Sequence, residues 1–209
     1  HPLSNERLSE SQSRAQRYDA LPLSKQQRHQ ALFDLLYWRT QSTGEHVSET
    51  ALTTAANNSV GAKLALMYWY GEQQRFGEAN EIYTELSALP AAQRQVLEPS
   101  LSITQSQILT EQNKWQQAAE LLESQQRLYP ERRDLRLYLA EALTNSNQPA
   151  KAQALLKPLT EQQPSDRYAW QSLQLANEKI AKTTDSPPLE KIATINALRY
   201  RSHDQLWSG

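Results

Sequence analysis

The sequence predicts an all-α fold built from stacked helix pairs, and three observations lead to this prediction. The composition favours helices, because glycine occurs only 5 times in 209 residues and β-branched residues are few beside the good helix formers Gln, Ala, Leu and Glu. Sequence features recur at a fixed interval through the middle of the chain. Proline and asparagine stand where the helices of such a repeat would end.

The interval is 34 residues. It separates Ala118 from Ala152 and Pro130 from Pro164. A period of 34 is typical of the tetratricopeptide repeat (TPR), a helix–turn–helix unit. Ala79 precedes Ala118 by 39 residues, so one repeat is expected to carry an insertion of about five residues. The predicted architecture is a set of TPR-like helix–turn–helix repeats stacked in a right-handed superhelical solenoid.

Each repeat position has a structural reason. Small residues at Ser106 and Ala140 on the first helices are expected to face alanines on the second helices, so that the two helices approach closely. Asn113 and Asn147 fall in the tight turns, where asparagine tolerates a positive φ. Trp170 stands where a fourth unit would begin to repeat the pattern.

The chain is expected to divide into residues 1–57, a set of N-terminal helices, and residues 58–209, a TPR repeat domain whose last repeat is incomplete. In the first repeat, either Ala65 is the small residue and the turn is longer, or Met67 occupies that position. The predicted helices span 3–17, 23–42, 46–57, 60–73, 76–88, 92–112, 115–128, 132–145, 149–162, 166–182 and 188–207.

The end of the chain resembles the first helix of a repeat without its partner. A helix over 188–207 is therefore expected to expose Ile195, Leu198 and Leu206. Because the chain begins at His1 and not at methionine, we expect it to be a piece of a longer protein, whose signal peptide would not be visible here.

Charge and composition exclude several classes. The net charge of −1 predicts no general attraction to nucleic acid or to an anionic membrane. The chain has no cysteine, which excludes disulfides and thiolate metal sites. No apolar run approaches the roughly 18 residues that would suggest a membrane span.

No catalytic or metal-binding pattern is present. The four histidines form no H-E-x-x-H motif and are not spaced to share a helical face. No serine lies in a G-x-S-x-G elbow, and the dispersed glycines form no phosphate-binding loop. We therefore expect no catalytic residue, no metal ligand set and no cofactor in this chain.

The aromatic run Tyr68-Trp69-Tyr70 has two interpretations. Consecutive residues point about 100° apart on a helix, so only part of the run fits a core. The run either packs between helices or presents an exposed aromatic anchor to a partner, since Tyr and Trp are enriched in interface hot spots.

The first residues resemble a known family. His1-Pro2 followed by Arg7-Leu8 is similar to the His-Pro-x-x-x-x-Arg-Leu/Ile segment that follows the active site of HtpX-like zinc metalloproteases. Among these, the BepA-type periplasmic proteases of Gram-negative bacteria carry a C-terminal TPR region, and the segment from Asn196 to Gly209 also resembles their last repeat. The resemblance implies a periplasmic parent that degrades or helps to assemble outer-membrane proteins. It also implies that residues 1–57 link to a missing protease domain, which would hold the zinc. Two alternatives are that His1 is a tag remnant, and that the chain is a stand-alone TPR adaptor or scaffold never joined to an enzyme.

A partner-binding groove is expected on the concave face, where the first helices of successive repeats converge. The predicted groove residues mix apolar and neutral hydrogen-bonding groups: Ile103, Gln107, Leu137, Glu141, Tyr168, Gln171 and Leu175. This mixture favours a protein segment over nucleic acid, whose phosphates would require a basic stripe. The resemblance implies that the partners are the outer-membrane protein assembly machinery or its substrates. The alternative is a solvated groove with no dedicated ligand.

Overall fold

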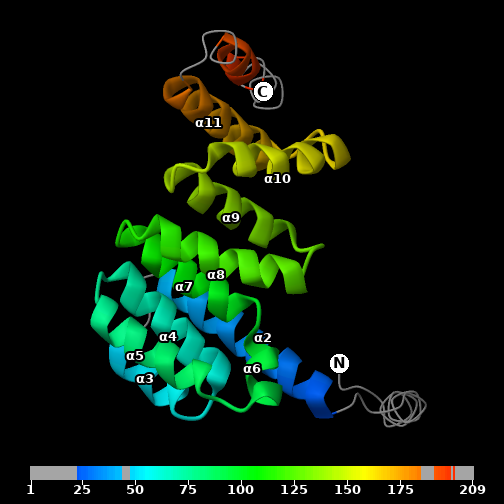
Figure 1. Ribbon diagram of the computed structural model, residues 1–209. Coiled ribbons are helices and arrows are strands. Elements are labelled where there is room, and N and C mark those ends of the chain that lie inside the picture. The colour runs from blue at the N-terminus through cyan, green and yellow to red at the C-terminus, as the bar shows by residue number, and fades with distance from the viewer. Residues whose placement is uncertain (1–22, 44–47, 185–190, 199, 201–209) are drawn as a thin grey trace, which may run out of the picture.

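The computed structural model describes residues 23–43, 48–184, 191–198 and 200, and all the regular structure in these ranges is helical (Figure 1). Ten helices follow one another over residues 23–183, and residues 191–198 are also helical. They are α2 (Leu23–Thr43), α3 (Glu49–Ala56), α4 (Val60–Glu72), α5 (Phe76–Ser87), α6 (Ala91–Leu97), α7 (Ser100–Glu111), α8 (Trp115–Leu128), α9 (Arg133–Asn145), α10 (Pro149–Gln162) and α11 (Arg167–Thr183).

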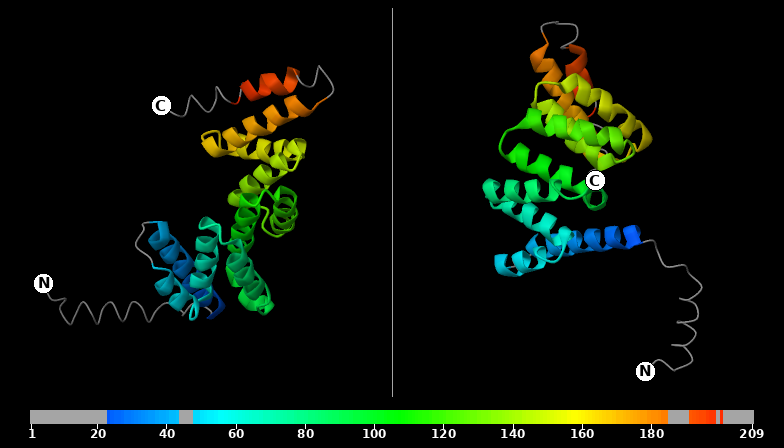
Figure 2. Two further views of the ribbon diagram at one scale, coloured as in Figure 1. Left: turned by 90° about the vertical axis from the view of Figure 1, so that its left-hand side faces the viewer. Right: turned by 60° about the horizontal axis from the view of Figure 1, so that its bottom comes forward.

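The helices form a TPR-like solenoid, as the sequence predicts. α4 pairs with α5, α7 with α8 and α9 with α10. Each second helix also contacts the next first helix, so that α8 lies between α7 and α9, and α10 between α9 and α11 (Figure 1). The array is curved, which Figure 2 shows in its left view.

The turn within each pair has one conformation. Gln74, Asn113 and Asn147 have φ values of 58°, 58° and 61°, and the N–H that follows each of them donates to the carbonyl five residues earlier, with N–O distances of 2.8 to 2.9 Å. This left-handed residue with a long-range bond closes a helix C-terminus in the Schellman manner. Because the three turns have the same length, Met67, and not Ala65, holds the position of the small residue in the first repeat. Both side chains are fully buried.

One predicted helix, 92–112, is wrong as a single element. The chain forms α6 and α7 instead, separated by Glu98 and Pro99. The residue before a proline is driven to extended backbone, and Glu98 has φ −76° and ψ 144°. The expected insertion is therefore α6 with its flanks, and α6 packs against α2.

The core consists of two clusters that meet at α7. Leu101 and Ile108 of α7 belong to the N-terminal cluster, which also includes Ala31, Leu52, Leu64, Met67, Ala79 and Leu86. Ile103 and Leu109 of α7 belong to the C-terminal cluster, which also includes Ala118, Leu122, Leu139, Ala140, Ala152, Leu156 and Leu173. The N-terminal cluster joins α2 and α3 to the first repeat, so the predicted division at residues 57 and 58 lies inside it.

Between the clusters, α7 carries a buried polar layer. Ser102, Thr104, Gln105 and Ser106 are all buried. The Ser102 hydroxyl donates to Glu98 Oε2 at 2.9 Å, and Ser106 donates to the carbonyl of Ile103 at 2.7 Å. Gln105 Nε2 donates to Asn80 Oδ1 at 3.1 Å. Buried polar groups require such partners, and these groups lie on the helix that contributes apolar residues to both clusters.

At the C-terminal end, Ile195 and Leu198 are exposed, as predicted. Leu206, the third expected member of this stripe, lies outside the described residues. In the described part of the chain, none of the helices combines the length and the apolar character that crossing a membrane would require.

Candidate functional site: a groove along the first helices

Two adjoining cavities follow the first helices of the repeats. The larger, about 600 Å³, lies between α9 and α11, and all its lining residues belong to these two helices. The smaller, about 170 Å³, lies where α4, α7 and α9 meet. Tyr138 and Glu141 line both cavities, so the two are parts of one groove.

Most of the predicted groove residues line these cavities. The larger cavity is lined by five of them: Leu137, Glu141, Tyr168, Gln171 and Leu175. Gln107 and Glu141 line the smaller one. Ile103 lines neither, because its side chain is only 8% exposed and packs into the C-terminal core cluster. The expectation for Ile103 is therefore corrected to a core role.

The apolar part of the groove comes mainly from α11. Tyr168 is 68% exposed and Leu175 is 58% exposed, and Gln171 lies between them on the same helical face. Leu137 is half-buried and packs partly against the core. Tyr168 and Leu175 are thus the large apolar side chains of the groove that are most available to a ligand.

The start of α11 is fixed by an ion pair with α9. Arg133 donates to both carboxylate oxygens of Asp166, each at 2.5 Å, and Asp166 also caps α11 by accepting from the N–H of Ala169 at 3.1 Å. Arg133 and this cap hold the pKa of Asp166 below its ordinary value. The pair joins the start of α11 to α9 at the larger cavity, which Arg133 lines.

The smaller cavity is lined by two tyrosines. Gln107 Nε2 donates to the hydroxyl of Tyr138 at 3.1 Å, and the guanidinium of Arg39, on α2, lies 4.0 Å from the centre of the Tyr68 ring. Burial raises the pKa of Tyr138, so its hydroxyl stays protonated at neutral pH. The aromatic run therefore divides: Tyr68 faces the groove, whereas Trp69 and Tyr70 pack on the N-terminal core cluster.

Prediction from the sequence missed the outer rows of the groove. Glu111, Asn145 and Lys179 line it, and each follows a predicted groove residue by one helical turn of four residues. A one-turn extension along the same helical face would have found them. Arg39 could not be found this way, because it reaches the groove from outside the repeats.

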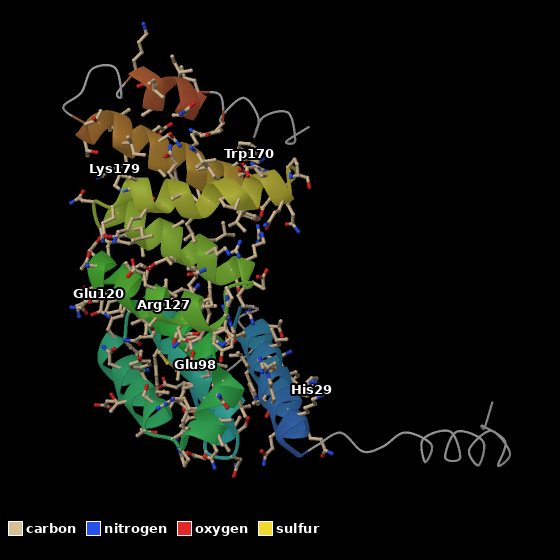
Figure 3. All side chains as sticks on the ribbon, turned by 45° about the vertical axis from the view of Figure 1, so that its right-hand side comes forward. His29, Glu98, Glu120, Arg127, Trp170 and Lys179 are labelled. Atoms are coloured by element: carbon tan, nitrogen blue, oxygen red, sulfur yellow. The ribbon has the colours of Figure 1, made fainter. Side chains whose placement is uncertain are left out.

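The described residues show no metal centre. No group of three His, Cys, Asp or Glu side chains among them is arranged to hold a metal ion. His29 is exposed on α2 (Figure 3), and the other three histidines lie outside the described residues.

Stacked helix pairs with a groove along their first helices define a helical-repeat interaction scaffold. Residues 109–176, from the end of α7 into α11, match the tetratricopeptide repeat family. No curated protein matches the chain. The matched segment contains α8, α9 and α10 and most of the residues that line the larger cavity, so this part of the chain consists of TPR units, which suggest a protein–protein interaction module.

Proposed function

We propose that the chain binds a segment of a partner protein in the groove along its first helices. The observation that carries this proposal is the exposure of Tyr168 and Leu175 inside the cavity of about 600 Å³. Large apolar side chains exposed together in a concave surface mark interaction sites. Gln171, Ser172 and Asn145 surround them with neutral hydrogen-bonding groups, which suit a polypeptide backbone.

The charges of the groove favour protein over nucleic acid. Carboxylates of Glu72, Glu111 and Glu141 line its smaller cavity, where they would repel phosphates. Nucleic-acid binding requires a continuous row of cations to replace counterions. Among the described residues that line the groove, Arg133 is paired with Asp166, and Lys179 and Lys182 lie together near the end of α11, so the cations form no such row.

The parent protein, we further propose, is a periplasmic zinc metalloprotease of the BepA type, in which this region holds outer-membrane assembly machinery or its substrates. The resemblance of the His1-Pro2 segment supports this assignment. A second support comes from α2, in the segment expected to adjoin the protease domain. Its Phe33, Leu36 and Tyr37 form an exposed apolar face, with the Phe33 and Tyr37 rings stacked at 6.2 Å. Such a face suits contact with a neighbouring domain.

The groove is tested by changing Tyr168 and Leu175 together to lysine. A photocrosslinking residue at Gln171 should capture a partner from outer-membrane assembly extracts, and the double variant should weaken capture by a few kcal/mol if the two residues are hot spots. Leu128→Lys is the matched control, because Leu128 is 70% exposed but lies on a second helix. Undiminished capture by the double variant would place the binding surface elsewhere.

The parent is tested by the gene upstream of His1. If the upstream part of the gene encodes an H-E-x-x-H motif, the protease assignment is supported. A different upstream domain, or none, would favour the stand-alone adaptor, and the groove proposal would stand in either case.

A further inference from the structure

The groove changes charge along its length at one repeat position. Glu72, Glu111, Asn145 and Lys179 are separated by 39, 34 and 34 residues, the intervals of the repeats themselves. The first two line the smaller cavity and the last two line the larger. The residue at this repeat position is therefore acidic in α4 and α7, neutral in α9 and basic in α11.

At the acidic end, three carboxylates line one hollow, and the guanidinium of Arg39 lies beside it, over the Tyr68 ring. Glu72, Glu111 and Glu141 all line the smaller cavity, and no ion pair is formed by any of them within the described residues. Burial, and then the negative charge of Glu111, raise the pKa of Glu141. Glu72 and Glu111 are also the last residues of α4 and α7, where the helix dipole disfavours a negative charge.

At the basic end, Lys179 and Lys182 line the larger cavity, and neither forms an ion pair in the described part of the chain. Lys179 lies toward the end of α11 opposite Trp170 (Figure 3). Glu178 lines the same cavity and accepts a hydrogen bond from Gln174 at 2.8 Å. The two lysines and this glutamate together give this end one excess positive charge.

Two other charged residues that line the larger cavity, Arg133 and Asp134, are paired. Arg133 is held by Asp166, and Asp134 is held by Arg132. A ligand therefore meets carboxylates toward α4 and, at the end of α11, two ammonium groups with Glu178 beside them. The exposed side chain of Leu175 lies on the helix that carries the ammonium groups.

We propose that the groove selects a polypeptide segment of mixed charge, with a Lys or Arg side chain at one end, an apolar residue in the middle and an Asp, Glu or C-terminal carboxylate at the other. This inference rests on the proposed function and names the chemistry of the partner. The cation enters the hollow among Glu72, Glu111 and Glu141, where the Tyr138 ring can contact its aliphatic stem.

The anion pairs with Lys179 and Lys182, and the apolar residue contacts Leu175. Charge complementarity of this kind acts mainly on specificity. If both ends of a segment carry the same charge, one of them always meets groove residues of the same sign, which repel it. The two ends also fix how the segment lies along the groove.

The test uses fluorescein-labelled synthetic peptides with one apolar centre and four pairs of ends: Lys with Glu, Lys with Lys, Glu with Glu, and Gln with Gln. The spacing between the ends is varied in parallel. Fluorescence anisotropy at low salt should give the Lys–Glu peptide the lowest Kd, by roughly tenfold over either like-charged peptide, and the difference should shrink as salt is added.

Two double variants assign the ends. Glu111→Gln with Glu141→Gln should remove the advantage of the Lys–Glu peptide over the Glu–Glu peptide. Lys179→Gln with Lys182→Gln should remove its advantage over the Lys–Lys peptide. Matched controls make the same changes in net charge at exposed positions outside both cavities, and they should leave the order of affinities unchanged: Glu81→Gln with Glu161→Gln, and Lys157→Gln with Lys191→Gln.

The outcomes separate this inference from the proposed function. Equal binding of all four peptides, or binding of none while Gln171 still crosslinks to a partner, would overturn the charge selection and leave the groove as the binding site. Partner capture that survives the Tyr168 and Leu175 double variant would overturn both. Circular dichroism of each variant checks that the helices are retained.

Discussion

The two halves of the molecule are built differently. From α7 to α11 the chain repeats one unit every 34 residues, with Ala118 and Ala152 fully buried at the same position of successive second helices. From α2 to α6 it holds a single regular pair, α4 and α5, onto which α2 and α3 pack separately, and the insertion α6 packs against α2.

The difference shows two ways of filling a core. The C-terminal half uses the same small and large residues at the same positions, so each pair packs like the one before it. The N-terminal half relies on contacts that occur once. Gly61 lets α4 approach α2, since a Cβ there would stand 2.0 Å from the carbonyl oxygen of Ala31. Asp34 of α2 accepts a hydrogen bond from Ser59, which caps α4, at 2.5 Å.

The largest expected effects come from truncating each core cluster. Leu64, in the N-terminal cluster, and Leu156, in the C-terminal one, are fully buried, and changing either to alanine should lower the free energy of unfolding by about 2–5 kcal/mol. Because the two clusters are distinct, each variant should raise hydrogen exchange mainly in its own half. Leu128→Ala, at an exposed site, is the control.

Mass-spectrometric hydrogen exchange checks this prediction. Equal loss of protection across α2–α11 in both variants would mean that the halves unfold as one unit.

The next effect concerns the close contact of α2 with α4. Gly61→Ala should destabilise the N-terminal half by roughly 1–3 kcal/mol, since the new Cβ meets backbone that must shift. Gly77→Ala is the matched control: no atom lies within 4 Å of its Cβ, and alanine is the better helix former in α5 by about 1 kcal/mol. Urea unfolding should thus give changes of opposite sign. A stabilising Gly61→Ala would show that α2 is not held in this position.

Lowering the pH should also change the stability of the two halves in opposite directions, through one carboxyl group in each. Arg133 lowers the pKa of Asp166, so Asp166 stabilises the C-terminal half above the ordinary aspartate pKa, and this stabilisation is lost as the pH falls through the lowered folded value. Burial raises the pKa of Glu98, ahead of α7, so its ionised form is unfavourable above the raised value. Protonation as the pH falls through that value removes the penalty.

The acid response is measured from the pH dependence of unfolding with Asp166→Asn and Glu98→Gln. Each contribution is expected to be on the order of 1 kcal/mol, because the Asp166 pair is partly open to solvent through Arg133. Asp166→Asn should flatten the loss of stability at low pH, and Glu98→Gln should steepen it. The same slope in both variants and the parent chain would contradict the assignment.

What the sequence could predict follows the same division. The 34-residue interval predicted the regular helix pairs and their buried alanines, and it indicated most of the residues that line the candidate groove. These residues could be predicted because each one has the same structural role in successive repeats. The close approach at Gly61 and the reach of Arg39 to Tyr68 depend on where α2 lies, and no local pattern contains that information. The break at Pro99 did carry a local signal, since proline disfavours helix in the residue before it.

The smallest expected effect tests whether the turns differ as their residues suggest. Gln74, Asn113 and Asn147 share one left-handed conformation, but asparagine tolerates a positive φ better than glutamine does, because its short side chain bonds locally. The regular half therefore has the better turn residue, and the first repeat holds glutamine in a strained conformation. Gln74→Gly should raise the free energy of unfolding by about 0.5–1 kcal/mol, and Asn147→Gly by less. Thermal unfolding of the two variants measures the difference, with Asn113→Gly as a second asparagine control. An equal gain at Gln74 and at the asparagines would mean that the backbone bonds of the turn, and not its residue, determine its stability.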